Sequence, residues 1–427
     1  MQDNQTKPIP KSGFPQLNET WNLLVHHPWF KYLAGVIIFA SLAQFLFNAV
    51  IQPTLWRQSI DFGGYYQWAK YLNPKLADVD PPWINYPPFW GLVIKPFTVL
   101  PFAIVQHLWR ALQMILVFIF IWGANRWLKT VRTPSIPYLY LTILFFITLC
   151  YTPVIATLSK GQANILILVL LGLSLWLFFR KHHYLSGIIL GITTMIKIFP
   201  GFLILYWLWK REYGIAFSAV ITILIIFLAT IGLLGLPMHI DWIKQTMHYA
   251  QYIRDHWTHQ ANISLYAFLR ESETQGLFPF HFAGEYLQTG IILGVILLFF
   301  GIVPRRKRLL PEEYAVEYSF AVSCIPLISI YTESHHFTFG LLGFIAVIAA
   351  AKQSPYIAKG LVILAWLTIT TGYHIIDKTL FPSECYLLYF SEMFGAILLW
   401  IGLGYILIYN RIKFLKQQNS SSESIRI

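Results

Sequence analysis

Residues 161–181 read GQANILILVLLGLSLWLFFRK, and this stretch decides the fold class. No charged residue occurs from 161 to 179, whereas Lys160 precedes the run and Arg180-Lys181 follows it. A helix that crosses the hydrocarbon core of a membrane needs about 20 apolar residues. The stretch therefore predicts a transmembrane helix over 161–179, with a cation and two amides where the helix begins.

The composition of the whole chain agrees with this interpretation. The chain has 427 residues, of which 56% are hydrophobic and 12% are charged, and its mean hydropathy is +0.57. These values are typical of a polytopic helical membrane protein with one domain. The net charge of +12 does not indicate a nucleic-acid partner, because the basic residues form short clusters between apolar segments, as in membrane proteins. The three cysteines lie far apart and predict free thiols.

The apolar segments predict an all-α polytopic fold with ten full spans and two broken elements. The spans are expected over 32–51, 103–125, 137–153, 161–179, 214–236, 286–303, 315–331, 336–351, 357–373 and 388–410. The first broken element, 88–101, is short and ends at Pro101, and the second, 184–209, is interrupted by Pro200-Gly201. Broken helices at membrane depth are tolerated where protein or a watery cavity surrounds them.

Basic clusters between the spans predict the orientation, because cytoplasmic loops carry an excess of Lys and Arg. Residues 1–31 form a cytoplasmic lead, 32–410 a single transmembrane domain and 411–427 a cytoplasmic tail. The longest outer loops, 52–87 and 237–285, are expected to hold short amphipathic helices and the functional site. The predicted location is the plasma (cytoplasmic) membrane, with the site on its outer, periplasmic face.

The first outer loop contains a carboxylate beside aromatic residues, in the sequence IDFGGYYQWAKY of residues 60–71. Its spacing predicts a short surface helix on which Tyr65 and Tyr66 form a shelf for a sugar ring. Asp61 is then placed to accept a proton from a sugar hydroxyl. An N-cap role for Asp61 is the alternative, and the two roles are compatible.

Asp78-Val79-Asp80 in the same loop is a DxD sequence. Its carboxylates are hard oxygen ligands of the kind that bind a divalent cation. A chance occurrence in an acidic loop that ends in prolines is the alternative, and no metal site is assigned from these residues.

Three further groups of polar residues belong to the predicted outer face. Lys160, Gln162 and Asn164 stand at a helix start, where anions such as phosphate bind readily. Arg270, in HQANISLYAFLR (259–270) with Asn262, is a suitable phosphate ligand. Interfacial snorkelling of Lys160, helix bridging by Asn164 and a surface ion pair of Arg270 are the alternatives.

The stretch YTESHHFTFG, residues 331–340, places Glu333, His335 and His336 between two apolar runs. Polar side chains at this depth are costly unless they have partners or a function. The three residues are too close in sequence for a good zinc site by themselves, so imidazole as a phosphate ligand or proton carrier is favoured. Lys197, near the predicted break in 184–209, faces either this site or the membrane interface.

No loop is long enough for a doubly wound nucleotide domain, and neither GxxxxGK[ST] nor a credible GxGxxG occurs. An activated group would therefore arrive within the bilayer, on a lipid phosphate. Cations and imidazoles around an aromatic, apolar site suit such a leaving group.

Several blocks occur in the order found in one enzyme family: DFGGYYQWA, NYPPFWGLVIKPFTVLPF, KGQANILILVLLGLSLW, NISLYAFLR and ESHHFTFGLL. From about residue 61 to about residue 350 the chain resembles glycosyltransferase family 87, the polyprenol-phosphate-mannose-dependent mannosyltransferases of the GT-C superfamily. The resemblance implies a GT-C fold, an inverting transfer that needs no metal or cofactor, a polyprenyl-phosphate sugar donor, and a lipid or glycan acceptor.

The resemblance also implies residue roles. Asp61 matches the catalytic aspartate of the first outer loop, which acts as the general base on the acceptor hydroxyl. His335 and His336 match the outer-face histidines near the donor phosphate or the acceptor. The residues at 160, 162, 164, 262 and 270 are carried over as substrate ligands. A lipid-linked sugar flippase or transporter, or a subunit without catalysis, is the alternative.

Overall fold

The computed structural model describes residues 28–48, 60–72, 86–131, 137–256, 262–276, 284–305, 309–372 and 389–424, and these are helical with no strand. The α-helices are α2 (Pro28–Leu46), α4 (Ile60–Tyr71), α5 (Pro88–Ile94), α6 (Phe102–Val131), α7 (Pro137–Leu149), α8 (Thr152–Lys160), α9 (Asn164–Phe179), α10 (His183–Ile196), α11 (Phe202–Trp209), α12 (Tyr213–Leu234), α13 (Leu236–Asp255), α14 (Leu265–Thr274), α15 (Gly284–Ile302), α16 (Pro311–Ile328), α17 (Gly340–Ala349), α18 (Tyr356–Gly372) and α20 (Ser391–Ser424). The 3₁₀ helices are η3 (Lys95–Val99), η4 (Phe199–Gly201) and η5 (Ser334–Phe339).

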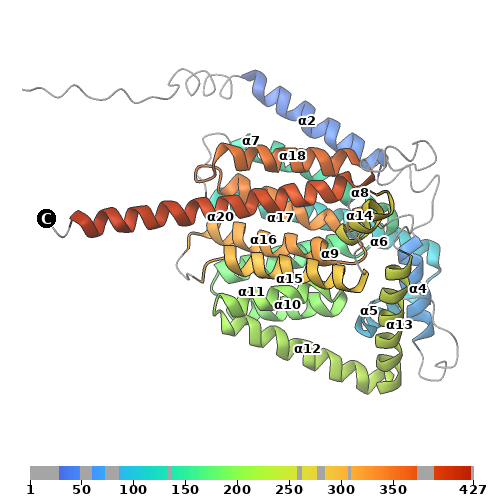
Figure 1. The fold of residues 1–427 in the computed structure, drawn as a ribbon. Helices are drawn as coiled ribbons and strands as arrows, with labels where there is room; N and C mark the ends of the chain where they lie inside the picture. Colours follow the sequence, from blue (N-terminus) through green and yellow to red (C-terminus); the bar gives the residue numbers. More distant parts are fainter. Residues whose placement is uncertain are drawn as a thin grey trace, which may run out of the picture.

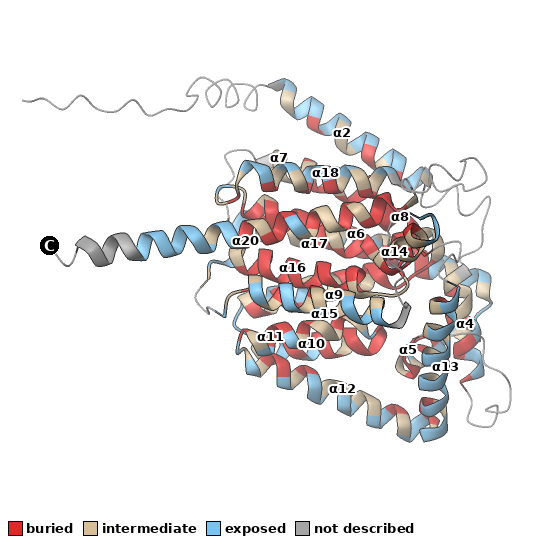
Figure 2. Ribbon diagram, viewed as in Figure 1, coloured by how far each residue is buried: buried red, intermediate tan, exposed pale blue. Residues whose placement is uncertain are grey.

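Most long helices run side by side as a bundle, and α4 and α13 lie at one end of it (Figure 1). Figure 2 shows that buried residues concentrate on the central helices, whereas α2, α12 and α13 expose much of their surface. Large apolar side chains are exposed along α12, including Ile221, Leu224 and Leu228. An exposed apolar surface of this kind is stable against lipid and unfavourable in water. The chain is therefore a membrane protein.

The number of full-length spans is smaller than expected among the described helices. Four of these helices are long and apolar enough to cross a membrane, namely α2, α6, α12 and α20. Helices α7 and α8 meet at a bend of 52° and pass the same test as a pair. Six further apolar stretches have 10–17 residues. Ten full spans are therefore not confirmed. The expected span 336–351, for example, is the short pair η5 and α17.

Short helices form both elements that were predicted to be broken, and their path in the membrane stays a prediction. The 88–101 element consists of α5 and η3, and Pro101 follows them. In the 184–209 element, α10 ends at Ile196 and the chain continues through η4 into α11. Proline lacks a backbone N–H and its ring clashes with the carbonyl group four residues earlier, which explains why α10 ends at Ile196, four residues before Pro200. The break leaves Lys197 in extended backbone as the C-cap residue of α10.

Small residues allow the closest helix contacts. A Cβ at Gly187 of α10 would lie 2.2 Å from the carbonyl oxygen of Ile215 on α12. A Cβ at Gly395 of α20 would lie 2.9 Å from the carbonyl oxygen of Ala365 on α18. Helices in membranes associate by such close backbone approach, because lipid gives no hydrophobic drive between them. These contacts hold α10 and α20, two helices that flank the site.

Candidate active site

Asp61 lies in the first turn of α4, inside the helix rather than before it. Its carboxylate is partly exposed, and its Oδ2 accepts a hydrogen bond of 2.8 Å from Nε2 of Gln162. Asp61 is the second residue of α4 and does not stand at the N-cap, which was the alternative role. A carboxylate in the first turn still complements the helix dipole. This hydrogen bond joins two residues that are 101 positions apart in the sequence.

Gln162 is the centre of a buried hydrogen-bond cluster between α8 and α9. Gly161, with φ of 72°, ends α8 and turns the chain toward α9. The side-chain Oε1 of Gln162 accepts from the hydroxyl of Tyr65 at 2.7 Å and from the hydroxyl of Tyr86 at 2.6 Å. Because both tyrosines donate to the oxygen, the amide nitrogen is directed toward Asp61. Gln162 therefore contacts the Asp61 carboxylate through its amide nitrogen, and its binding of substrate stays a prediction.

The two tyrosines stay protonated in this environment. Burial raises the pKa of Tyr65 well above its ordinary value, and the nearby Tyr86 and Asp61 raise it further. Burial also raises the pKa of Tyr86 strongly. Deprotonation of a buried hydroxyl beside a carboxylate is unfavourable, because the new charge lacks water and meets a like charge. Both hydroxyls thus remain donors to Gln162.

The expected aromatic shelf on α4 is wrong. Tyr65 and Tyr66 are 4% and 3% exposed, and neither ring presents an open face for a sugar. The hydroxyl of Tyr66 donates to the carbonyl oxygen of Leu100 at 2.6 Å, and its ring packs against Phe102. The aromatic side of α4 packs into the protein core, since burying several large rings is more favourable than leaving them in water.

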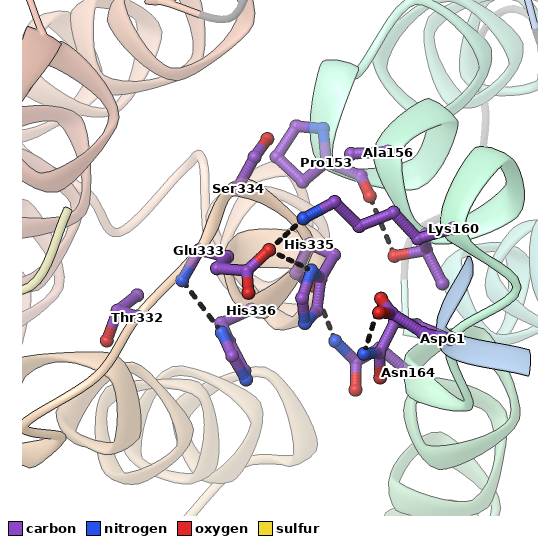
Figure 3. A network of polar contacts seen from close by, with 12 residues as sticks. Asp61, Pro153, Ala156, Lys160, Asn164, Thr332, Glu333, Ser334, His335 and His336 are labelled. Atoms are coloured by element: carbon purple, nitrogen blue, oxygen red, sulfur yellow. Dashed lines mark hydrogen bonds and ion pairs between the residues drawn. The ribbon is translucent and has the colours of Figure 1, made fainter. Parts of the chain in front are cut away.

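The turn at 333–336 brings charged groups together from two parts of the chain (Figure 3). Lys160, at the end of α8, forms an ion pair with Oε2 of Glu333. The hydroxyl of Tyr331 donates to Oε1 of the same carboxylate. The backbone N–H of Glu333 donates to Nδ1 of His336 at 2.9 Å, and Nδ1 of His335 lies 3.6 Å from Oε2 of Glu333. These contacts fix the turn and the ring of His336, whereas Nδ1 of His335 is buried beside the carboxylate without a hydrogen-bond partner among the described residues.

Asn164 and Lys197 connect this turn to the helix break. Nδ2 of Asn164 donates to the carbonyl oxygen of His335 at 2.7 Å. Nζ of Lys197 donates to Oδ1 of Asn164 at 3.1 Å and lies 3.3 Å from Nε2 of His336. Lys197 is only 9% exposed, and its ammonium lies 5.1 Å from the ring centroid of Tyr86. Lys197 therefore faces the site and does not snorkel to the interface.

Two of the expected ligands have structural contacts. Nδ2 of Asn262 donates to the carbonyl oxygen of Ile330 at 3.2 Å, and its Oδ1 accepts from the backbone N–H of Thr332 at 3.3 Å. Asn262 thus holds the chain that enters the histidine turn. Arg270 forms an ion pair of 2.7 Å with Glu273 one turn further along α14, so its binding of phosphate remains a prediction.

Sequence reasoning missed Tyr86 and Glu392. Tyr86 begins the YPP block that contributed to the family resemblance, so a signal was present. Glu392 lies in the first turn of α20, is fully buried, and accepts a hydrogen bond of 2.8 Å from Ser334. The region after residue 357 offered no motif, and only folding brings it to the turn.

No group of three or more His, Cys, Asp or Glu side chains that could hold a metal ion occurs within the described residues. Asp78 and Asp80 lie outside those residues. Their role as metal ligands is therefore untested by the structure.

Comparison with known proteins places the chain in a family. The sequence profile of glycosyltransferase family 87 matches residues 83–329, more than half of the chain. The chain belongs to glycosyltransferase family 87. This family 87 match leaves Asp61, His335 and His336 outside its range, so the case for those three residues rests on their geometry.

One similar protein is the polyprenol-phosphate-mannose-dependent alpha-(1-2)-phosphatidylinositol pentamannoside mannosyltransferase of Mycobacterium tuberculosis. It is 27% identical to this family 87 chain over 151 residues, which cover 35% of the chain and 32% of the relative. The match thus spans about a third of the relative's length. No solved structure matches the chain.

Proposed function

We propose that this chain moves a hexose, with mannose as the first candidate, from a polyprenyl-phosphate donor to a hydroxyl of a lipid or glycan acceptor. Family membership supports glycosyl transfer, and the printed name of the mycobacterial relative supports the donor and the sugar. The observation that carries the proposal is the position of Asp61 beside cationic and imidazole side chains from three other segments, namely Lys160, Lys197 and the histidines of η5 (Figure 3). Such a pairing of base and leaving-group ligands is what transfer from a phosphate requires.

Asp61 is the proposed general base. The acceptor hydroxyl attacks the anomeric carbon of the donor sugar from the face opposite the phosphate, and Asp61 takes its proton. The new glycosidic C–O bond forms as the bond from the anomeric carbon to the phosphate oxygen breaks. The electron pair leaves with polyprenyl phosphate, and the sugar configuration is inverted. The hydrogen bond from Gln162 to Oδ2 leaves the other oxygen of Asp61 for the acceptor.

The donor phosphate is proposed to bind between Lys197 and His336. Their facing nitrogens lie 3.3 Å apart, and Nδ1 of His336 accepts from a backbone N–H, so a neutral ring carries its proton on Nε2. An anionic oxygen can accept hydrogen bonds from both groups. Lys160 is already paired with Glu333 and adds positive charge near the turn. A weakly basic phosphate leaving group then needs no acid catalyst.

The proposed membrane arrangement is a GT-C-type fold with ten spans and two broken elements, both termini in the cytoplasm and the site on the outer face. The short apolar stretches then cross the membrane within the bundle, where neighbouring helices cover their ends. The polar cluster involves α4, α8 and η5, near the end of the bundle where α13 crosses (Figure 1). A transporter would place its ionisable residues near the midplane between repeated halves.

The test is transfer of radiolabelled mannose from polyprenol phosphate to an extracted lipid and glycan pool, with the protein in nanodiscs. Asp61→Asn is compared with wild type and with Asp241→Asn, a control on the exposed surface of α13. Loss of a general base reduces the rate by about 10²- to 10⁴-fold. We expect that loss in Asp61→Asn alone, with no effect of EDTA on wild type.

If Asp61→Asn transfers mannose as fast as wild type, Asp61 is not the base, and Glu333 and His335 become the next candidates. Inhibition by EDTA that added Mg²⁺ reverses would instead assign a metal, with Asp78 and Asp80 as the first ligands to test. Movement of the intact lipid donor across the bilayer without transfer would favour a flippase.

A further inference from the structure

The chain turns sharply between α12 and α13 at Gly235. Its φ of 83° and ψ of 155° lie in a region that is essentially reserved for glycine. His239 stabilises the turn, since its Nδ1 lies 3.0 Å from the carbonyl oxygen of Gly235 and its Nε2 lies 2.9 Å from Oγ1 of Thr230 on α12. The imidazole is 1% exposed. Helix α13 is thus held across the end of the bundle, at a steep angle to the spans (Figure 1).

Helix α13 has three distinct faces. One packs on the protein through residues that include His239 and Ile253. The second face, here named the apolar stripe, is exposed and consists of Leu236, Ile240, Ile243 and Met247. The third face, here named the polar stripe, is also exposed and consists of Lys244, His248, Gln251 and Asp255. Both stripes follow the spacing i, i+4, i+7, i+11 of a single helix face.

The apolar stripe continues the exposed apolar surface of α12. Helix α12 qualifies as a membrane span, and only 22% of its most apolar window is buried inside the protein. Large apolar side chains are exposed on α12 up to Leu233, which is 66% exposed, and the stripe begins at Leu236, which is 53% exposed. Met247 is 67% exposed. A row of this kind in water would be unfavourable, whereas a helix with adjacent apolar and polar faces is stable in a membrane interface.

We propose that α13 lies in the membrane interface on the side of the active site, with the apolar stripe in lipid hydrocarbon and the polar stripe among headgroups and water. The occupant of the stripe is membrane lipid. This inference does not depend on the chemistry proposed for Asp61.

The packed face of α13 connects this lipid contact to the site. The ring of Tyr249 meets the ring of Tyr331 edge to face, with centroids 5.9 Å apart. The hydroxyl of Tyr331 donates to the carboxylate of Glu333, which also pairs with Lys160. A helix seated on lipid therefore touches the turn that carries both histidines, so the depth of α13 in the membrane bears directly on the position of Glu333.

The test measures depth by spin labelling in phosphatidylcholine nanodiscs. Single cysteines at Ile243 and Met247 are compared with matched cysteines at Lys244 and His248, one position further along the same helix. The native Cys385 is replaced by serine, and Cys150 and Cys324 are buried. Collision of each label with oxygen, which enters hydrocarbon, is compared with collision with a water-soluble nickel complex.

We expect the ratio of oxygen to nickel collisions to be high at 243 and 247 and to fall at 244 and 248. Equal nickel access at all four positions would place α13 in water and overturn the proposal. Exclusion of both reagents from 243 and 247 would mean that protein covers the stripe, which also overturns it. As a check that avoids thiol labelling, benzoylphenylalanine at 243 should yield a lipid adduct on illumination, and benzoylphenylalanine at 244 should yield much less.

Discussion

The pair Tyr65 and Tyr86 should act cooperatively on the orientation of Asp61. Both hydroxyls donate to the same oxygen of Gln162, at 2.7 Å and 2.6 Å. Tyr65→Phe or Tyr86→Phe leaves one donor, which still directs the amide nitrogen to Asp61. In the double variant the buried Oε1 of Gln162 has lost both of these donors, and among the described residues only the hydrogen bond from its amide nitrogen to Asp61 still orients the side chain.

The expected magnitudes follow from these contacts. A neutral hydrogen bond contributes about 0.5–1.5 kcal/mol, whereas one to a charged group contributes about 1.5–3 kcal/mol. Each single variant should lower kcat by less than about threefold, because the bond from Gln162 to Asp61 persists. In the double variant the buried Oε1 is left without these donors, so the amide turns toward other partners and that bond is lost. Since about 1.36 kcal/mol corresponds to tenfold in rate, kcat should fall by about 10- to 150-fold.

The assay is kcat for mannosyl transfer at saturating donor in nanodiscs. Tyr66→Phe is the matched control, because this hydroxyl lies on the same helix but donates to Leu100. It should leave kcat unchanged. A double variant whose loss equals the product of the two single losses would refute the shared-acceptor argument, and so would a loss confined to KM.

Two further predictions concern the buried ion pair and the pH profile. Lys210 and Glu317 are 0% and 1% exposed and lie 2.8 Å apart, so Lys210→Met alone should destabilise the protein by about 3–5 kcal/mol, while Lys210→Met with Glu317→Leu should recover most of that loss. Thermal unfolding in detergent measures both, and an equal loss in the double variant would contradict the argument. Burial raises the pKa of Tyr65 and of Tyr86 above the value near 10 that tyrosine has in the unfolded chain. Both hydroxyls are therefore fully protonated below pH 10, and they lose their protons only as the pH rises through the higher pKa values of the folded protein. The kcat ratio of wild type to the double Phe variant should therefore stay constant from about pH 7 to 9, and a decline of that ratio across this range would show that a tyrosine ionises there.

Local sequence patterns predicted the broken elements well but the span lengths poorly. Pro200-Gly201 indicated the interruption near Lys197, because a proline cannot bond to the carbonyl group four residues earlier, here that of Ile196. The stretch 336–351 is apolar enough to suggest a span, yet it forms η5 followed by ten residues of α17. Neighbouring helices bury this segment, and a helix enclosed by protein does not need the length that lipid demands.

The aromatic residues of α4 show the same limit. Their number and spacing indicated a helix with one aromatic face, which is correct. Whether that face meets a sugar or the protein core depends on what packs against it, and Phe102 and Trp90 do so. Tyr65 contacts the candidate site through its hydroxyl, which donates to Gln162, while its ring is buried.

The sequence by itself determined that this is a helical membrane protein, and it named a few short polar stretches as the candidate site. Hydropathy, proline breaks and residue type are local properties that can be read without a fold. The tertiary structure decided which of these stretches meet: Gln162 reaches Asp61, Asn164 reaches His335, and Glu392 reaches Ser334. A hydrogen bond requires its two atoms within about 3 Å, and for residues tens to more than a hundred positions apart only the packing of the bundle sets that distance.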